Sequence, residues 1–213
     1  RRHQQDQNVT SRFLYLNTHR LLAYGWQHGS LRAEGVFDND EGGLRQFADY
    51  LRQHRHSQFS LLANVAEEGH ALETIPFLKG SDRQTLISRK MGQHFFSTPL
   101  TTATSLGYEK SQRKNEKLLL SALTNPAHFE PWLTRISDAE VSLAGIYTVA
   151  QLGGQLLRKL GQHCERCLLL TVQDHSIRET YLVDGHPHFS RMAPVTDSSI
   201  AGIASALAAE SGK

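Results

Sequence analysis

The same order of predicted secondary-structure elements occurs twice in this chain. Alternating apolar runs predict strands over residues 13–16, 21–26, 31–37, 168–172, 177–183 and 188–192. A helix follows each set of three strands, and its apolar side chains recur at helical spacing. The first strands begin 168 − 13 = 155 residues apart, and the helices begin 199 − 44 = 155 residues apart. A β-β-β-α unit repeated at a fixed distance predicts a duplicated fold.

Local turn and cap signals agree with these boundaries. Asp184-Gly185 is a strong two-residue hairpin signal, and residues 28–30, His-Gly-Ser, predict a turn at the corresponding place in the first unit. Asp197 is expected to cap the last helix. Ser81 and Gln84 have the spacing of a capping box and predict that a further helix begins there.

The middle of the chain alternates between strands and helices. Strands are predicted over residues 59–65, 71–75, 101–108, 118–123 and 141–147. A helix after Thr148 is expected to turn its larger apolar side chains inward, namely Val149, Leu152, Leu156, Leu157 and Leu160. The order strand, helix, strand, helix, strand from residue 118 onward predicts right-handed crossovers and a parallel sheet edge.

Three meandering strands, a helix, and then alternating strands and helices describe an α/β, ribonuclease-H-like mixed sheet flanked by helices. Two such units side by side make the actin and Hsp70 type of ATPase fold. We therefore predict a first lobe over residues 12–163 and the β-β-β-α start of a second lobe over residues 164–213.

Composition narrows the function classes. The 213 residues include 39% hydrophobic and 21% charged residues, which is enough to build a buried core. The formal charge is only +2 and no basic stripe is present, so a nucleic-acid partner is not expected. No apolar run is long enough to predict a transmembrane segment. Two cysteines give no secreted disulfide framework, which favours a cytoplasmic protein.

Several segments resemble a known family. Residues 177–192, Ile-Arg-Glu-Thr-Tyr-Leu-Val-Asp-Gly-His-Pro-His-Phe-Ser-Arg-Met, resemble an element of the bacterial actin-like assembly proteins, a strand, Asp-Gly and a strand ending in Ser-Arg. Residues 59–68 and 74–76 resemble the strand pair before the second helix of that group. These are the cytoplasmic actin-like components of type IV pilus, mannose-sensitive pilus and type II secretion machines.

The resemblance implies a cytoplasmic scaffold, peripheral at the inner membrane, that binds a partner's cytoplasmic tail or a secretion motor. It is also compatible with a homodimer. Some members of the family bind ATP and others have lost the site.

The hypothesis that the protein binds ATP depends on two turns. An actin-like ATPase binds phosphate in the turn between the first two strands of each unit, where Asp and Gly let backbone amides approach the phosphates. The first turn here is residues 17–20, Asn-Thr-His-Arg, without Asp or Gly. The second is residues 174–176, Asp-His-Ser, without Gly. Asp174, Ser176, Asn17 and Thr18 are the candidate contacts if ATP and Mg²⁺ bind. We expect a vestigial site and a protein without catalytic activity.

Two alternatives to the scaffold remain open, an ATP-binding actin-like protein that uses the four candidate contacts and a metal-dependent enzyme. A metal-dependent nuclease or phosphohydrolase on the same fold would need acidic residues around metal ions, and only Glu67, Glu68 and Asp174 are available for that role. Cys164 and Cys167 have Cys-x-x-Cys spacing, but no second pair completes a zinc site. We expect Cys167 to be buried and Cys164 to be half-exposed.

Overall fold

A computed structural model describes residues 10–110 and 112–212. The chain divides into two compact units. The first unit holds the chain up to Val65 and the segment Ala127–Val149, and the second unit holds Ala66–Pro126 and the chain from Ala150 onward. The boundary predicted between residues 163 and 164 separates the two copies of the repeated fold, which is a different division from this one, and it stays a prediction. None of the described helices is long and apolar enough to cross a membrane.

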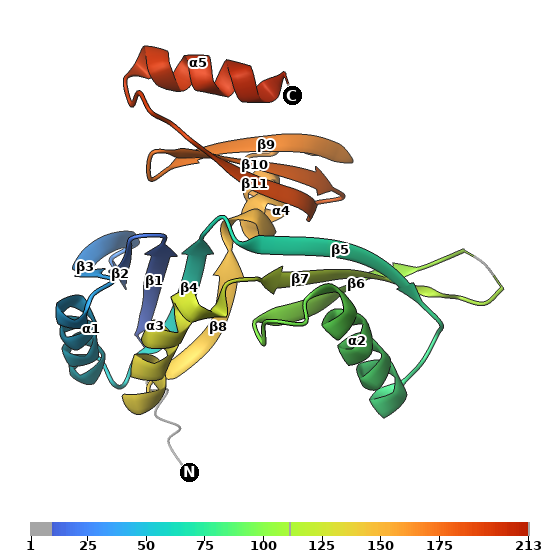
Figure 1. Cartoon of the computed structure of the whole chain (residues 1–213), viewed down its shortest axis with the longest axis horizontal. Coiled ribbons are helices and arrows are strands. Elements are labelled where there is room, and N and C mark those ends of the chain that lie inside the picture. The colour runs from blue at the N-terminus through green and yellow to red at the C-terminus, as the bar shows by residue number, and fades with distance from the viewer. Residues whose placement is uncertain (1–9, 111, 213) are drawn as a thin grey trace, which may run out of the picture. The chain divides into compact units, whose positions relative to one another are not determined.

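The first unit is built on a mixed five-stranded sheet. Its strands are β1 (Ser11–Asn17), β2 (Arg20–Gln27), β3 (Ser30–Asp38), β4 (Gln58–Asn64) and β8 (Ser142–Thr148). Their order in the sheet is β3-β2-β1-β4-β8 (Figure 1). The first three strands form an antiparallel meander, and β4 and β8 add to it in parallel. The predicted α/β mixed sheet is therefore confirmed.

Two helices pack against one face of this sheet, α1 (Glu41–Gln53) and α3 (Pro126–Asp138). The ring of Phe47 on α1 lies 5.4 Å from that of Trp132 on α3, and both side chains are fully buried. Alternate residues of the central strands, such as Leu14 and Leu61, face these helices and are equally buried. Asp40 caps α1 by accepting a hydrogen bond from Gly43 N at 2.7 Å.

The second unit contains a sheet that the sequence analysis assigned wrongly. Residues 118–123 do not form a parallel sheet edge. They belong to β7 (Glu116–Leu123), which lies between β5 (Glu68–Ile75) and β6 (Thr101–Tyr108) in an antiparallel sheet. Because β7 is central and nearly all of its residues are buried, it has the continuous apolar run that is also typical of a parallel strand.

The helix α2 (Gly80–His94) packs on this antiparallel sheet through Met91, which contacts the core of Ile75, Leu118 and Leu120. The predicted capping box at its start is wrong, because Lys79 occupies the N-cap position and no side chain there accepts a hydrogen bond.

The repeated meander is present in the second unit. It consists of β9 (Arg166–Gln173), β10 (Ser176–Val183) and β11 (His186–Pro194), in the order β11-β10-β9. The three strands begin 166 − 11 = 155, 176 − 20 = 156 and 186 − 30 = 156 residues after their counterparts. The helix α5 (Ile200–Ser211) follows, and its N-cap is Ser199, which accepts a hydrogen bond from Gly202 N, not the predicted Asp197.

The helix α4 (Val149–Lys159) packs in a different way from the one predicted. Leu156 and Leu160 were expected to face inward, yet they are 42% and 62% exposed. The buried positions include Gly153 and Gly154. A Cβ atom at Gly154 would lie 2.0 Å from the carbonyl oxygen of Gly185, so only glycine allows this close approach.

Candidate functional sites in two hairpins and a helical groove

The first candidate phosphate hairpin joins β1 to β2 and is closed by the side chain of Asn17. Its Oδ1 accepts hydrogen bonds from the backbone amides of His19 at 2.9 Å and Arg20 at 3.0 Å. The carbonyl oxygen of Asn17 accepts a third hydrogen bond from His128 Nε2 at 2.9 Å. Asn17 is 6% exposed, whereas Thr18 is exposed. The turn is therefore an Asx-type turn in which the side chain organises the backbone.

This arrangement matters for phosphate binding because backbone amides are what a phosphate-binding turn supplies. The two amides that follow Asn17 already donate to its side-chain oxygen. A phosphate at this turn would have to displace that oxygen, and the turn contains no glycine to bring further amides close. The geometry of the first hairpin thus favours an internally satisfied turn.

The second candidate hairpin joins β9 to β10 and has another conformation. Asp174 and His175 have positive φ angles of 51° and 57°, as in a two-residue type I′ turn. The Ser176 hydroxyl, at a residue that is 9% exposed, donates to the carbonyl oxygen of Gln173 at 2.8 Å. Asp174 is exposed, and His175 lies 2.7 Å from Ser198 Oγ through its Nδ1.

Each hairpin lies in its own unit, so the four candidate residues form two local groups, Asn17 with Thr18 and Asp174 with Ser176. Whether they contact ATP stays a prediction. The Ser176 hydroxyl donates its proton to the carbonyl oxygen of Gln173, whereas a contact with phosphate would require that proton to be donated to a phosphate oxygen.

Of the three carboxylates considered for a metal site, Glu68 already has a partner within the protein. Glu68 forms an ion pair with Arg178 inside the second unit, where the two side chains are 2% and 1% exposed. Arg178 also donates to Ser190 Oγ at 2.7 Å. Within residues 10–110 and 112–212, no three His, Cys, Asp or Glu side chains lie close enough together to hold a metal ion.

The two cysteines lie at the junction between α4 and β9. Cys164 is exposed and Cys167 is only half-buried, so the expectation of a buried Cys167 is wrong. Burial and a hydrogen bond with Cys164 raise the pKa of the Cys167 thiol to about 11. At neutral pH Cys167 is therefore a protonated thiol, which is a poor nucleophile.

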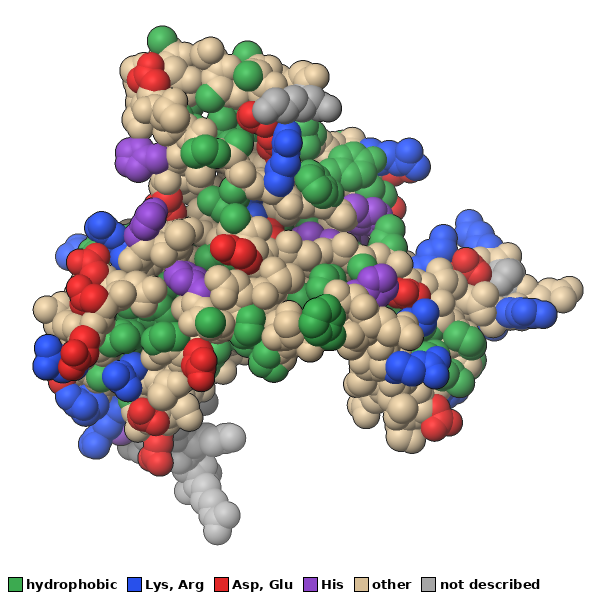
Figure 2. Space-filling view, in the orientation of Figure 1, with side chains coloured by type: hydrophobic (Ala, Val, Ile, Leu, Met, Phe, Trp, Pro, Cys, Tyr) green, Lys and Arg blue, Asp and Glu red, His purple; other side chains and the backbone are tan. Residues whose placement is uncertain are grey.

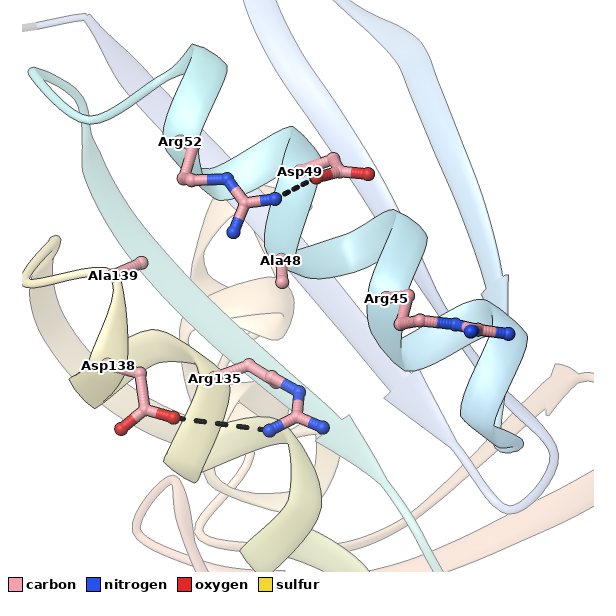
Figure 3. A pocket seen from close by; sticks show the side chains of 7 residues that line it. All are labelled: Arg45, Ala48, Asp49, Arg52, Arg135, Asp138 and Ala139. Atoms are coloured by element: carbon pink, nitrogen blue, oxygen red, sulfur yellow. Dashed lines mark hydrogen bonds and ion pairs between the residues drawn. The ribbon is translucent and has the colours of Figure 1, made fainter.

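The structure also shows a groove that the sequence analysis did not identify. It lies between α1 and α3 on the first unit, and it has a volume of about 370 Å³. Figure 3 shows the side chains that line it, which are Arg45, Ala48, Asp49, Arg52, Arg135, Asp138 and Ala139. Arginine and aspartate therefore form its rim, and two alanines lie between them. Figure 2 shows acidic and basic side chains interleaved over this part of the molecule, at the lower left.

A sequence signal for the groove existed on one helix only. Residues 45, 48 and 52 share the stripe of α1 that points away from its buried residues, at helical spacing. The pairing of this stripe with Arg135 depends on the packing of α3 beside α1, which no local pattern reveals.

No family model matches the sequence, and no curated protein matches it. The structure is similar to one described as a PilM-PilN type IV pilus biogenesis complex, with a TM-score of 0.61 and 11% identity, over 88% of this chain and 62% of that chain. This chain therefore spans less than two thirds of that chain.

Two further solved structures match less closely. The cytoplasmic domain of EpsL, an inner-membrane component of the type II secretion system of Vibrio cholerae, matches with a TM-score of 0.49 and 9% identity, over 88% of this chain and 72% of that one. A Bacteroides thetaiotaomicron protein described as having an actin-like ATPase fold gives 0.48 and 8%, over 88% and 71%. Taken with the sheet order, the similarity to the PilM-PilN structure shows that this chain has a ribonuclease-H-like α/β fold.

Proposed function

We propose that this protein is a non-catalytic cytoplasmic scaffold of a pilus or secretion assembly machine, and that it binds a protein partner there. The observation that carries the non-catalytic part is the first hairpin, where Asn17 Oδ1 occupies the amides of His19 and Arg20. Phosphoryl transfer depends on positioning and charge around the phosphates, so the loss of one phosphate turn removes much of that machinery.

Support for the pilus or secretion setting comes from the fold. The structure at a TM-score of 0.61 is described as a complex of two pilus biogenesis proteins. The family resemblance of residues 177–192 points to the same class of machine. A scaffold in this setting offers surfaces and grooves to a partner's cytoplasmic tail, and such recognition needs no chemistry.

Calorimetric titration with Mg-ATP tests the non-catalytic part. We expect no heat of binding at nucleotide concentrations up to the millimolar range. Titration of Asp174→Ala and Ser176→Ala variants provides the control, because these residues are the remaining candidate contacts. Micromolar binding that disappears in these variants would contradict the proposal and support an ATP-binding protein.

Crosslinking in the native host tests the scaffold part. The full chain carrying a photo-crosslinker is expected to capture an inner-membrane protein with a short cytoplasmic segment. Identification by mass spectrometry of soluble enzymes alone would argue against an assembly role.

A further inference from the structure

The positive charge of the chain is unevenly distributed. The segment from Glu73 to Lys117 contains eight Lys and Arg residues and four Asp and Glu residues, a net charge of 8 − 4 = +4. The whole chain carries +2, so all the other residues together carry 2 − 4 = −2. This count includes the two carboxylates that form ion pairs here, Glu73 with Lys90 and Glu116 with Arg83. The excess of positive charge therefore remains after the internal ion pairs are counted.

Much of this excess lies at the hairpin that joins β6 to β7. Lys110, Arg113 and Lys114 form what we call the basic turn, and all three are exposed. The hairpin is closed by a hydrogen bond from Glu109 N to the carbonyl oxygen of Asn115 at 2.8 Å. Among the residues that the structure describes, no carboxylate forms an ion pair with the basic turn. Figure 2 shows Lys and Arg side chains over this hairpin and α2, at the right.

Two exposed aromatic side chains lie next to the basic turn. Phe77 and Tyr108, here called the aromatic pair, are 45% and 54% exposed, and their ring centroids are 5.8 Å apart. Lys79 Nζ lies 5.5 Å from the centroid of the Phe77 ring, which is within the range of a cation–π interaction. Tyr108 immediately precedes the hairpin loop, so the aromatic pair and the basic turn belong to one surface. This surface combines exposed apolar area with positive charge.

Such a combination suits the surface of an anionic bilayer. Clustered lysines and arginines are attracted by the negative surface potential of anionic lipids. Aromatic rings favour the headgroup region, where apolar and hydrated layers meet. Nucleic acids also attract cations, but single strands bind by stacking their bases on open aromatic rings. Phe77 already has Lys79 over its ring and Tyr108 beside it, which favours lipid over a nucleic acid.

We propose that the basic turn and the aromatic pair bind the surface of a membrane that contains anionic phospholipid. The three cations of the basic turn contact lipid phosphates, and the aromatic pair reaches the headgroup region. Glu109 and Asp82 are close in sequence to these residues and oppose binding, since they repel the same phosphates. The inference goes beyond the proposed scaffold function, because it concerns attachment to lipid and not to a protein partner.

Co-sedimentation of the full chain with lipid vesicles tests the proposal. We expect saturable binding to vesicles of phosphatidylglycerol mixed with phosphatidylcholine, and none to vesicles of phosphatidylcholine alone. Binding should weaken as salt is added, because exposed charges are screened. The variant Lys110→Gln/Arg113→Gln/Lys114→Gln is expected to weaken binding by about a hundredfold, since it loses three attractions to the lipid surface.

The matched control removes the same charge elsewhere. Arg32→Gln/Arg45→Gln/Arg55→Gln lowers the net charge by the same amount at exposed arginines of the first unit. It should keep the affinity for the vesicles within a few-fold of the wild type, because the attraction is local. Circular dichroism confirms that each variant is folded.

Two more variants separate the aromatic and the electrostatic parts. Phe77→Ala should weaken binding several-fold and leave its dependence on salt unchanged, because no charge is removed. Glu109→Gln/Asp82→Asn should tighten binding several-fold, a gain that misfolding cannot imitate. The glutamine at position 109 keeps an oxygen that can accept the hydrogen bond from Asn115 Nδ2, which is 3.1 Å long in the wild type.

Three results would overturn the proposal. One is the absence of binding of the wild type to phosphatidylglycerol vesicles. Another is an equal affinity of the wild type and the basic-turn variant, or an equal loss in that variant and the control. The third is binding of a single-stranded oligonucleotide that depends on the basic turn, without any binding to vesicles, which would assign the surface to nucleic acid. None of these results alters the nucleotide titration or the crosslinking, so failure here and failure of the proposed function are distinguishable.

Discussion

The two β-β-β-α repeats, β1 to α1 and β9 to α5, share an order of elements but differ in how they are stabilised. In the first, β1 has β2 on one side and β4 on the other, and α1 buries Phe47, Tyr50 and Leu51. In the second, β9 pairs only with β10 among the described strands, and α5 has no buried residue. The same secondary-structure pattern therefore supports a well-packed helix in one place and a loosely packed one in the other.

The two repeats also differ in their buried polar side chains and in their hairpins. With the offset of 156 residues between β2 and β10, the half-buried Leu22 corresponds to the buried Arg178, which pairs with Glu68. The first hairpin is organised by an asparagine side chain, while the second relies on two residues with positive φ. A repeated fold thus preserves strand order more strictly than it preserves the chemistry within the strands. Four measurements test this difference, and they follow in order of decreasing expected effect.

The largest effect is expected from Arg178→Leu, which places the counterpart of Leu22 in the second unit. It leaves the Glu68 carboxylate buried without its ion-pair partner, and we expect a loss of about 4 kcal/mol in the free energy of unfolding. Urea denaturation measures this loss. The double variant Arg178→Leu/Glu68→Leu should recover most of the stability, and a double variant as unstable as the single one would show that the pair itself is required.

Truncation of equivalent leucines compares the two helices directly. Leu51 on α1 is fully buried, and Leu207, 156 residues later on α5, is half-buried. Leu51→Ala is expected to cost about 3 kcal/mol, because it leaves a cavity in a packed core. Leu207→Ala should cost at most about 1 kcal/mol, because it loses less buried area. Equal losses in thermal unfolding would refute the difference in packing.

A smaller effect is expected in the first hairpin. Asn17→Ala removes the acceptor for the amides of His19 and Arg20, with an expected cost of about 1 kcal/mol. Thr18→Ala is the neighbouring control, since Thr18 is exposed, and it should change stability very little. Hydrogen exchange should show faster exchange of the two amides in Asn17→Ala alone. Unchanged protection there would mean that the side chain does not organise the turn.

The smallest effect concerns pH and the ion pair of the first unit. Burial raises the pKa of Glu34, but hydrogen bonds from Tyr50 and Arg12 outweigh it, so the folded pKa lies below the usual value. A lowered folded pKa stabilises the protein above the unfolded pKa, and this contribution is lost as the pH falls through the folded pKa. Glu34→Gln should flatten the acid side of the stability curve. If stability falls as steeply with acid in Glu34→Gln as in the wild type, other carboxylates cause the acid sensitivity.

Much of the fold could be predicted because its signals are local. The turn at His28 and Gly29, for example, has φ angles of 50° and 79°, as the His-Gly dipeptide before a strand suggested. The candidate site could be predicted only in part. Residues 17–20 and 174–176 were located as turns, but the occupation of two amides by Asn17 depends on a side-chain conformation that no spacing fixes.

Local sequence patterns were sufficient to predict the order of the elements, the repeated meander and the absence of glycine from both candidate phosphate turns, because periodicity and turn chemistry are set within a few residues. Which strands and helices contact one another became clear only from the folded chain. The tertiary structure placed β7 between β5 and β6, packed α4 through Gly154 and brought Arg135 beside Arg45. The reason is physical, since strand pairing and helix packing are choices between surfaces far apart in the chain, and the free energy that decides them is shared among many contacts.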